Sequence, residues 1–292
     1  MKNYLQKAYC MHETVRIYAA ITTDIVKHYQ EIFNMWPTSA AALGRTLTIG
    51  AIMSSTYKSG EYLNIKIEGD GPIGKIIVEA TDGLVRGFVT NPGVYLSYNN
   101  GHLDVKDAIG NGHLEVVKDL HMRAPFSSSV ELVSGEIAED FSYYFAKSEQ
   151  IPSAVGLGVL FDTESKVKAS GGFLIQVMPG ATDEDITKLE NKLKNIKPCS
   201  QMIDEGYTAI DIIKEITDGD YKLLEEKELN YFCNCSYDRF KRGIKSLGKM
   251  EIKDILNTDK KCEITCNFCN KKYIFNESDL IQIYQELDEK ND

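Results

Sequence analysis

Four cysteines in two closely spaced pairs constrain this chain more than any other feature. Cys233 and Cys235 form a C-x-C motif, and Cys266 and Cys269 form a C-x-x-C motif after a gap of thirty residues. Each motif brings two sulfur atoms together in a tight turn, as a tetrahedral metal site requires. No histidine follows His121, so sulfur supplies all the ligands of such a site. The pattern predicts one structural Zn²⁺ held by four thiolates, with no coordination position open for catalysis.

Other interpretations of the thiols stay open. The four cysteines can be unrelated, or buried as small hydrophobic side chains, although Lys271–Phe275 resembles the second strand of a zinc-knuckle hairpin. Cys262 is a fifth local thiol, four residues before Cys266, that can displace one ligand. We favour a non-ligand role for it because the paired set is already complete.

A zinc-bound thiolate is electron-rich, so an oxidant that reaches it can form a disulfide and expel the metal. Zinc supplies about 10–16 kcal/mol of apparent binding energy in zinc-finger peptides, where it maintains the fold. Its loss is therefore expected to unfold the last sixty residues. A closed four-sulfur site indicates a structural element or a structural switch.

Length and charge limit the function further. A chain of 292 residues accommodates one large domain and one smaller one. It has no apolar run of eighteen residues and no signal-peptide core, so we expect neither a membrane partner nor export. Seven cysteines in an unexported chain indicate a reducing compartment, and we therefore expect a cytoplasmic protein. The net charge is −10, and residues 232–292 carry eleven acidic and eleven basic side chains. This balance argues against a nucleic-acid partner.

The pattern of apolar residues predicts an α+β main domain over residues 1–180. Hairpin-linked strands are mixed with clustered helices, in contrast to strict βαβ alternation. We expect helices after Thr22 or Thr23, from Thr38 or Ser39 to about Tyr57, and over 139–150. The expected strands are 14–21, 63–67, 75–79, 84–89, 129–137, 154–161 and 172–177.

Residues 181–231 have the composition of a charged helical linker between two domains. Thr182 and Thr208 are suitable caps for amphipathic helices. Because packing supplies most helix stability, we hypothesise that losing zinc releases them. In the zinc-binding domain, residues 232–292, we expect Ser236 to cap a helix that extends to Leu247. Residues 279–287 are expected to form a closing helix.

Several potential sites are discounted. Gly69–Lys75 has the spacing of a phosphate-binding loop, but Ile76 replaces the required Ser or Thr and a strand follows it where a helix is needed. The five histidines are scattered, and no motif marks a nucleophile. Cys10 and Cys199 are interpreted as ordinary thiols. We therefore assign no catalytic residue and no further cofactor-binding residue.

The chain resembles the 33 kDa chaperonin family, the redox-regulated heat-shock holdases of bacteria, over essentially its whole length. The cysteine pairs and their gap carry the resemblance, together with Ala42-Leu43-Gly44-Arg45, Gly69-Asp70-Gly71-Pro72, Val85-Arg86-Gly87, Ser148-Glu149-Gln150 and Gly171-Gly172-Phe173-Leu174-Ile175-Gln176. The extra thiol Cys262 is the departure from this pattern, because it can scramble a disulfide formed by the second cysteine pair, Cys266 and Cys269.

The resemblance implies an ATP-independent chaperone, not an enzyme, that binds unfolding client proteins under oxidative and heat stress. It implies that Cys233, Cys235, Cys266 and Cys269 bind zinc in the reduced, inactive state. The resemblance also implies that oxidation forms the disulfides Cys233–Cys235 and Cys266–Cys269 and releases zinc. The redox-switch domain would then unfold, which would loosen the linker and favour a homodimer.

Two alternatives from other classes remain. A zinc-ribbon module for nucleic acid or a fixed protein partner would bind equally well with zinc retained. A thiol-disulfide oxidoreductase would use Cys266 and Cys269, but that motif normally opens a helix in a βαβ setting, whereas a hairpin is expected here.

Overall fold

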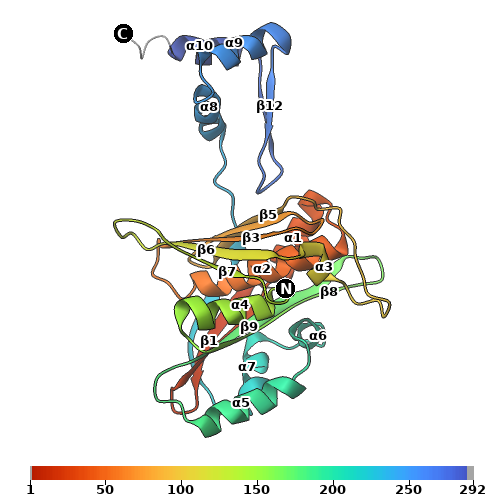
Figure 1. The fold of residues 1–292 in the computed structure, drawn as a ribbon, viewed down its shortest axis with the longest axis vertical. Coiled ribbons are helices and arrows are strands. Elements are labelled where there is room, and N and C mark those ends of the chain that lie inside the picture. Colours follow the sequence, from red (N-terminus) through yellow and green to blue (C-terminus); the bar gives the residue numbers. More distant parts are fainter. Residues whose placement is uncertain (1, 288–292) are drawn as a thin grey trace. The chain divides into compact units, whose positions relative to one another are not determined.

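The computed structural model describes residues 2–287 and divides the chain into two compact units, Met1–Phe232 and Cys233–Asp292 (Figure 1). Each unit has a hydrophobic core of its own. Both mix helices with antiparallel strands, which confirms the α+β class. No helix of the described residues is both long and apolar enough to cross a membrane.

Five strands of the first unit form a sheet in the order β10-β1-β2-β9-β8, with every neighbouring pair antiparallel. Helices pack against both faces of this sheet, so its central strands are apolar on both sides. In β2, six of seven residues are buried. The bounds are β1 Tyr4–Cys10, β2 Val15–Ile21, β8 Ser153–Phe161, β9 Val167–Val177 and β10 Lys222–Glu228.

A second sheet has the order β11-β5-β4-β3-β6-β7 and is antiparallel except for the short β11–β5 pair. In β3, buried Leu63, Ile65 and Ile67 alternate with more exposed neighbours, as the period of two predicted. The bounds are β3 Tyr62–Gly69, β4 Lys75–Thr81, β5 Leu84–Val89, β6 Gly112–Asp119, β7 Phe126–Glu131 and β11 Asn230–Tyr231, and a short helix, α3 Val105–Ile109, precedes β6.

Helix α2 (Pro37–Ser54) lies between the two sheets, beside α1 (Thr23–Phe33) (Figure 1). Seventeen of its eighteen residues are buried, as expected for a helix that is apolar on all sides. Its glycines allow close packing: a Cβ on Gly44 would lie 2.7 Å from Val26 Cγ1 and 2.9 Å from Val159 Cγ2. The small residues thus serve the core, as the sequence predicted.

The other face of the five-stranded sheet packs against α5 (Asp183–Asn195), α6 (Cys199–Asp204) and α7 (Ala209–Thr217). Thr182 and Thr208 cap α5 and α7 in capping boxes, as predicted. The same stretch ends in β10, a strand that its charged sequence did not reveal, and β10 pairs with β1. Residues 181–231 therefore belong to the first compact unit, and the boundary between the two units lies after Phe232.

Some expected elements differ from the observed ones. The strand expected over 129–137 ends at Glu131, because Ile137 adopts a positive φ of 71° and begins α4 (Ala138–Tyr144), donating its N–H to Asp140. The helix expected over 139–150 is α4 followed by a π-helical turn, η1 (Phe145–Glu149). The helix expected from Thr38 or Ser39 begins at Pro37, the first residue of α2, where a missing N–H costs nothing.

The second unit consists of α8 (Tyr237–Lys245), α9 (Lys249–Thr258), the hairpin of β12 (Cys262–Thr265) and β13 (Lys272–Phe275), and α10 (Glu277–Glu286). Ser236 caps α8 and the hairpin forms as predicted, whereas α9 was not anticipated. Its core has six buried side chains: Ile244, Ile252, Tyr273, Phe275, Leu280 and Ile283.

The close packing of α2 around Gly44 predicts that Gly44→Ala destabilises the first unit. Alanine favours a helix by up to about 1 kcal/mol, but its methyl group overlaps Val26 and Val159, so we expect a net loss of about 1–3 kcal/mol. Urea unfolding followed by the fluorescence of Trp36, the chain's single tryptophan, measures this unit. Gly93→Ala, where an added Cβ meets nothing within 4 Å, is the matched control and should change stability by less than about 0.5 kcal/mol.

Candidate metal centre

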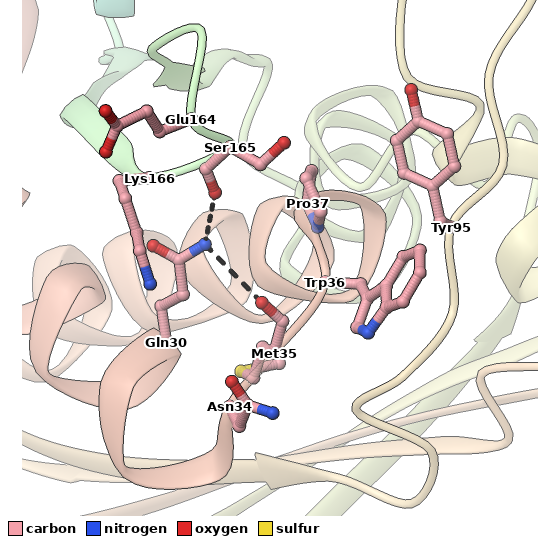
Figure 2. Close-up of a pocket in the computed structure, with 9 residues that line it drawn as sticks. All are labelled: Gln30, Asn34, Met35, Trp36, Pro37, Tyr95, Glu164, Ser165 and Lys166. Atoms are coloured by element: carbon pink, nitrogen blue, oxygen red, sulfur yellow. Dashed lines mark hydrogen bonds between the residues drawn. The ribbon is translucent and has the colours of Figure 1, made fainter.

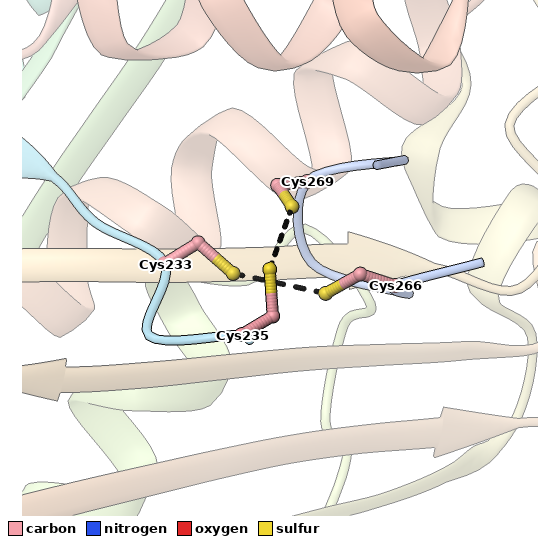
Figure 3. Close-up of side chains that lie close together, drawn as sticks. All are labelled: Cys233, Cys235, Cys266 and Cys269. Atoms are coloured by element: carbon pink, nitrogen blue, oxygen red, sulfur yellow. Dashed lines mark hydrogen bonds between the residues drawn. The ribbon is translucent and has the colours of Figure 1, made fainter. Parts of the chain in front are cut away.

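Two turns of the second unit bring the four cysteines of the paired motifs together (Figure 3). Cys233 and Cys235 lie just before the cap of α8. Cys266 and Cys269 lie in the turn between β12 and β13, which is closed by hydrogen bonds from Cys266 N to Lys271 O and from Asn270 N to Cys266 O, each 2.9 Å. The hairpin register therefore positions one pair, and the start of α8 positions the other.

The sulfur atoms have the spacing of a tetrahedral site. The Sγ atoms of Cys233 and Cys266 are 3.7 Å apart, those of Cys235 and Cys269 are 3.4 Å apart, and all four lie within 4.8 Å of one another. A tetrahedron with metal–sulfur bonds of about 2.3 Å has sulfur–sulfur edges of about 3.8 Å. All four thiols are free. The arrangement thus fits a tetrahedral ion in a reduced chain.

The protons of these thiols respond to their crowding. Burial acts to raise the pKa of Cys235, but hydrogen bonds from the Tyr273 hydroxyl, 3.1 Å away, and from the other thiols outweigh it and lower that pKa to about 7. Burial is the largest cause that raises the pKa values of Cys233 and Cys269, and the hydrogen bonds of each to Cys266 and to Cys235 raise them further. The cluster alone stabilises one thiolate. A divalent cation would stabilise all four, because thiols that coordinate a metal are deprotonated.

The donor set selects the kind of ion. Four soft sulfur donors in a tetrahedron suit Zn²⁺ or an iron–sulfur centre, and no imidazole or carboxylate belongs to the group. Four protein ligands close the coordination sphere, which is typical of a structural site. Within residues 2–287, no other group of three or more His, Cys, Asp or Glu side chains has metal-binding geometry.

A family model described as "Hsp33 protein" matches residues 3–276. The chain belongs to the Hsp33 family. It is 45% identical over 281 residues to the 33 kDa chaperonin of Bacillus subtilis, covering 95% of this chain and 97% of the relative, and 45% identical over 295 residues to that of a Geobacillus species, covering all of both. Among solved structures, the 33 kDa chaperonin (heat shock protein 33 homolog) of Thermotoga maritima matches with a TM-score of 0.93 and 33% identity, covering 99% of this chain and 100% of that one.

Cys262, the fifth thiol near the C-terminus, lies apart from the cluster in the structure. It begins β12, pairs with Phe275 at the far end of the hairpin, and packs against the core of the second unit. Cys10 and Cys199 are buried in the first unit, where burial raises the pKa of each to about 12. These three thiols are therefore poor nucleophiles at neutral pH.

The setting of the C-x-x-C motif also differs from that of thiol oxidoreductases. Cys266 and Cys269 lie in a β-hairpin turn, as expected. In an oxidoreductase, a helix N-terminus lowers the pKa of the attacking thiol. The Gly69–Lys75 loop is likewise a hairpin between β3 and β4 without a helix.

Two features near the site were not anticipated from the sequence. Tyr273 was assigned to a strand but not to the sulfurs, because only the hairpin register aims its hydroxyl at Cys235. The two residues before Cys233 are anchored in the first unit: the Tyr231 ring stacks on His28 at 3.7 Å, and the Arg86 guanidinium lies 5.1 Å from the centre of the Phe232 ring. These contacts fix the last two residues of the first unit.

The first unit also has an open cavity of about 300 Å³ beside the N-terminus of α2 (Figure 2). The side chains of Trp36 and Tyr95 form one wall and are about half exposed. Gln30 donates from its amide nitrogen to the carbonyl oxygens of Ser165 at 2.7 Å and Met35 at 3.5 Å. The lining contains no cysteine or histidine, so this cavity offers no thiolate or imidazole to a metal ion.

The contact between Tyr273 and Cys235 predicts the effect of Tyr273→Phe. Without the hydroxyl donor, the thiolate of Cys235 loses a hydrogen bond in the folded unit. The affinity of the reduced chain for zinc, measured by competition with a chromophoric chelator, should then fall about 2- to 10-fold, the effect of one hydrogen bond. Tyr284→Phe, which removes another tyrosine hydroxyl of the same unit, should leave zinc affinity unchanged.

Proposed function

We propose that this member of the Hsp33 family is a redox-regulated holdase, which binds unfolding proteins without ATP and is switched by the four-cysteine cluster. In the reduced chain, Cys233, Cys235, Cys266 and Cys269 would hold one Zn²⁺ and the protein would be inactive. The observation that carries the proposal is the gathering of these four sulfurs within 4.8 Å in a chain whose relatives are named 33 kDa chaperonins.

Bound Zn²⁺ would contribute about 10–16 kcal/mol to the stability of the second unit. Within residues 233–287 of that unit, six large apolar side chains are buried, and a core of this size seldom maintains a fold alone. The hairpin turn and the start of α8 meet at the sulfurs. Oxidising the four thiolates would therefore release the metal ion that cross-links the hairpin turn to the start of α8.

Peroxide would carry out that oxidation. For each pair, two thiols and one H₂O₂ give one disulfide and two H₂O, so the two pairs transfer four electrons to two peroxide molecules. We propose the pairs Cys233–Cys235 and Cys266–Cys269, whose members are two and three positions apart in the chain. The sulfur–sulfur contacts of 3.7 and 3.4 Å run across the motifs, and all four sulfurs lie within 4.8 Å, so the sulfurs of each motif are also close to one another.

Unfolding of the second unit would loosen residues 181–231 through the backbone at Phe232. Helix α5 has a single buried residue, Leu189, so little packing stabilises it. Ile212, Ile213 and Ile216 of α7 are buried against the sheet and would become a source of apolar surface. Exposed apolar surface of this kind would bind clients and would favour a homodimer.

A chaperone of this design acts by binding, so we assign it no catalytic residue. Its seven thiols, all free, suit a reducing cytoplasm in which oxidants are a stress signal. The net charge of −10 argues against binding to nucleic acid, and therefore against the alternative of a nucleic-acid-binding module that holds zinc permanently.

One titration tests the function. Zinc release, free thiols and the suppression of aggregation of heated citrate synthase are measured together, before and after peroxide treatment with mild heat. We expect suppression to increase in step with the loss of zinc and of four thiols per chain, and peptide mapping to give the two disulfides within the motifs. Equal suppression by the zinc-bound, reduced chain would refute the switch, and disulfides across the motifs would refute the pairing.

Cysteine variants test the ligand assignment. Cys262→Ser should keep one zinc ion per chain, because Cys262 packs in the core away from the cluster. Cys266→Ser is the matched substitution four residues away. It should lower zinc affinity by at least about 100-fold and expose the second unit to proteolysis, since it removes one of four ligands. Metal content by mass spectrometry and limited trypsin digestion are the measurements; loss of zinc from Cys262→Ser would contradict the ligand set.

A further inference from the structure

The outer strand of the five-stranded sheet, β8, has an edge that lacks the usual protection against pairing. β8 (Ser153–Phe161) has the sequence SAVGLGVLF, nine residues without a charge or a proline. Proteins commonly protect sheet edges with charged residues, proline or very short strands. At the opposite edge of the same sheet, β10 has five charged residues among seven. β8 has only a bulge at its end, between Leu160 and Phe161.

The register shows which backbone groups of β8 face outward. Val177 donates its N–H to Pro152 O at 2.9 Å, and in an antiparallel pair the residues that bond to the partner strand alternate. Ala154, Gly156, Gly158 and Leu160 therefore bond to β9, and the residues between them point away from the sheet. Val155 N, one of the outward groups, donates to Ser142 Oγ of α4 at 3.1 Å.

Beyond Val155, the edge is open. Across residues 2–287, no group bonds the outward N–H or C=O of Leu157 or Val159. The side chains of these two residues pack partly against the main core, and Leu160 packs against the core on the other face. Both faces beside the open edge are therefore apolar, and an added strand would bury apolar side chains on either side.

We propose that β8 is a client-binding edge, to which an extended, uncharged segment of an unfolded protein adds as a sixth strand. The inference rests on the proposed holdase function and names the surface and the mode of binding. Main-chain hydrogen bonds supply affinity in strand addition and do not depend on the client's side chains, which suits a partner of no fixed sequence. β8 carries no charge and has apolar side chains beside its open edge, so an uncharged client segment complements it.

The residues that cover the strand connect it to the switch. An added Cβ on Gly158 would lie 2.9 Å from Ser200 N of α6, so α6 rests directly on this part of β8. Helix α6 belongs to residues 181–231, which the proposed function loosens on oxidation. Its departure would free the apolar face beside the open edge for the side chains of a client.

Amide exchange gives the decisive test. The oxidised, full-length chain is first shown to suppress citrate synthase aggregation and is then titrated with an eight-residue peptide of alternating valine and threonine. We expect NMR-detected exchange at Leu157 and Val159 to slow at least about tenfold, with little change at Gly156 and Gly158, which already bond to β9. The same peptide with two consecutive N-methylated amides, which blocks both of its edges, should leave exchange unchanged.

A pair of variants isolates the backbone contribution to peptide binding. Leu157→Ala and Leu157→Pro both lose the leucine side chain, but only the proline removes the outward N–H. Anisotropy of the labelled peptide should show at least about tenfold weaker binding to Leu157→Pro than to Leu157→Ala. Ser129→Pro, at an exposed position of the edge strand β7 that also faces outward, is the matched control and should bind as the unmodified chain does.

The outcomes separate the two proposals. Aggregation suppression without protection at Leu157 and Val159, or equal binding by the two Leu157 variants, overturns the β8 site and leaves the holdase function intact. Protection that appears without peptide and increases with protein concentration assigns the edge to a second copy and also overturns the site. Absence of suppression in both redox states overturns the holdase function itself.

Discussion

The mutual approach of four sulfur atoms is the contact on which the second unit depends. Its three helices and its hairpin share a core of six buried apolar side chains, and the hairpin turn and the start of α8 meet at the cysteines. Without a cation, hydrogen bonds favour the thiolate of Cys235, whereas burial raises the pKa values of Cys233 and Cys269. A tetrahedral cation would stabilise all four thiolates, and the fold of the unit would then be coupled to the chemical state of sulfur.

In the proposed function, the five-stranded sheet of the first unit would connect this chemistry to client binding. One face is covered by α1 and α2, where Gly44 and its neighbours pack without space for a methyl group. The other face is covered by α5, α6 and α7, which belong to a segment with thirteen acidic and seven basic residues between 182 and 231. The sheet therefore has one permanently packed face and one covered by a charged segment that ends two residues before the first cysteine of the cluster.

Local patterns in the sequence were sufficient for much of this architecture. Thr182, Thr208 and Ser236 were expected to cap helices, and all three do, because capping depends on residues within one turn. The strands around Ile65 and the hairpin after Cys269 also follow their patterns. Prediction failed where tertiary contacts override local preference. β10 is charged but completes a sheet beside β1, and Ile137 takes a positive φ at the start of a helix, where the Asp140 carboxylate accepts its N–H.

The sequence by itself determined the ligand type of the candidate metal centre, because the spacing within C-x-C and C-x-x-C is a local property and no histidine follows position 121. It also indicated the Hsp33 family, to which the chain belongs. Only the tertiary structure decided which thiols meet: the hairpin register directs Cys266, Cys269 and the Tyr273 hydroxyl to one end and Cys262 to the other. It likewise decided that β8 lies at an edge, because strand order is set by non-local pairing and packing, which a one-dimensional pattern does not contain.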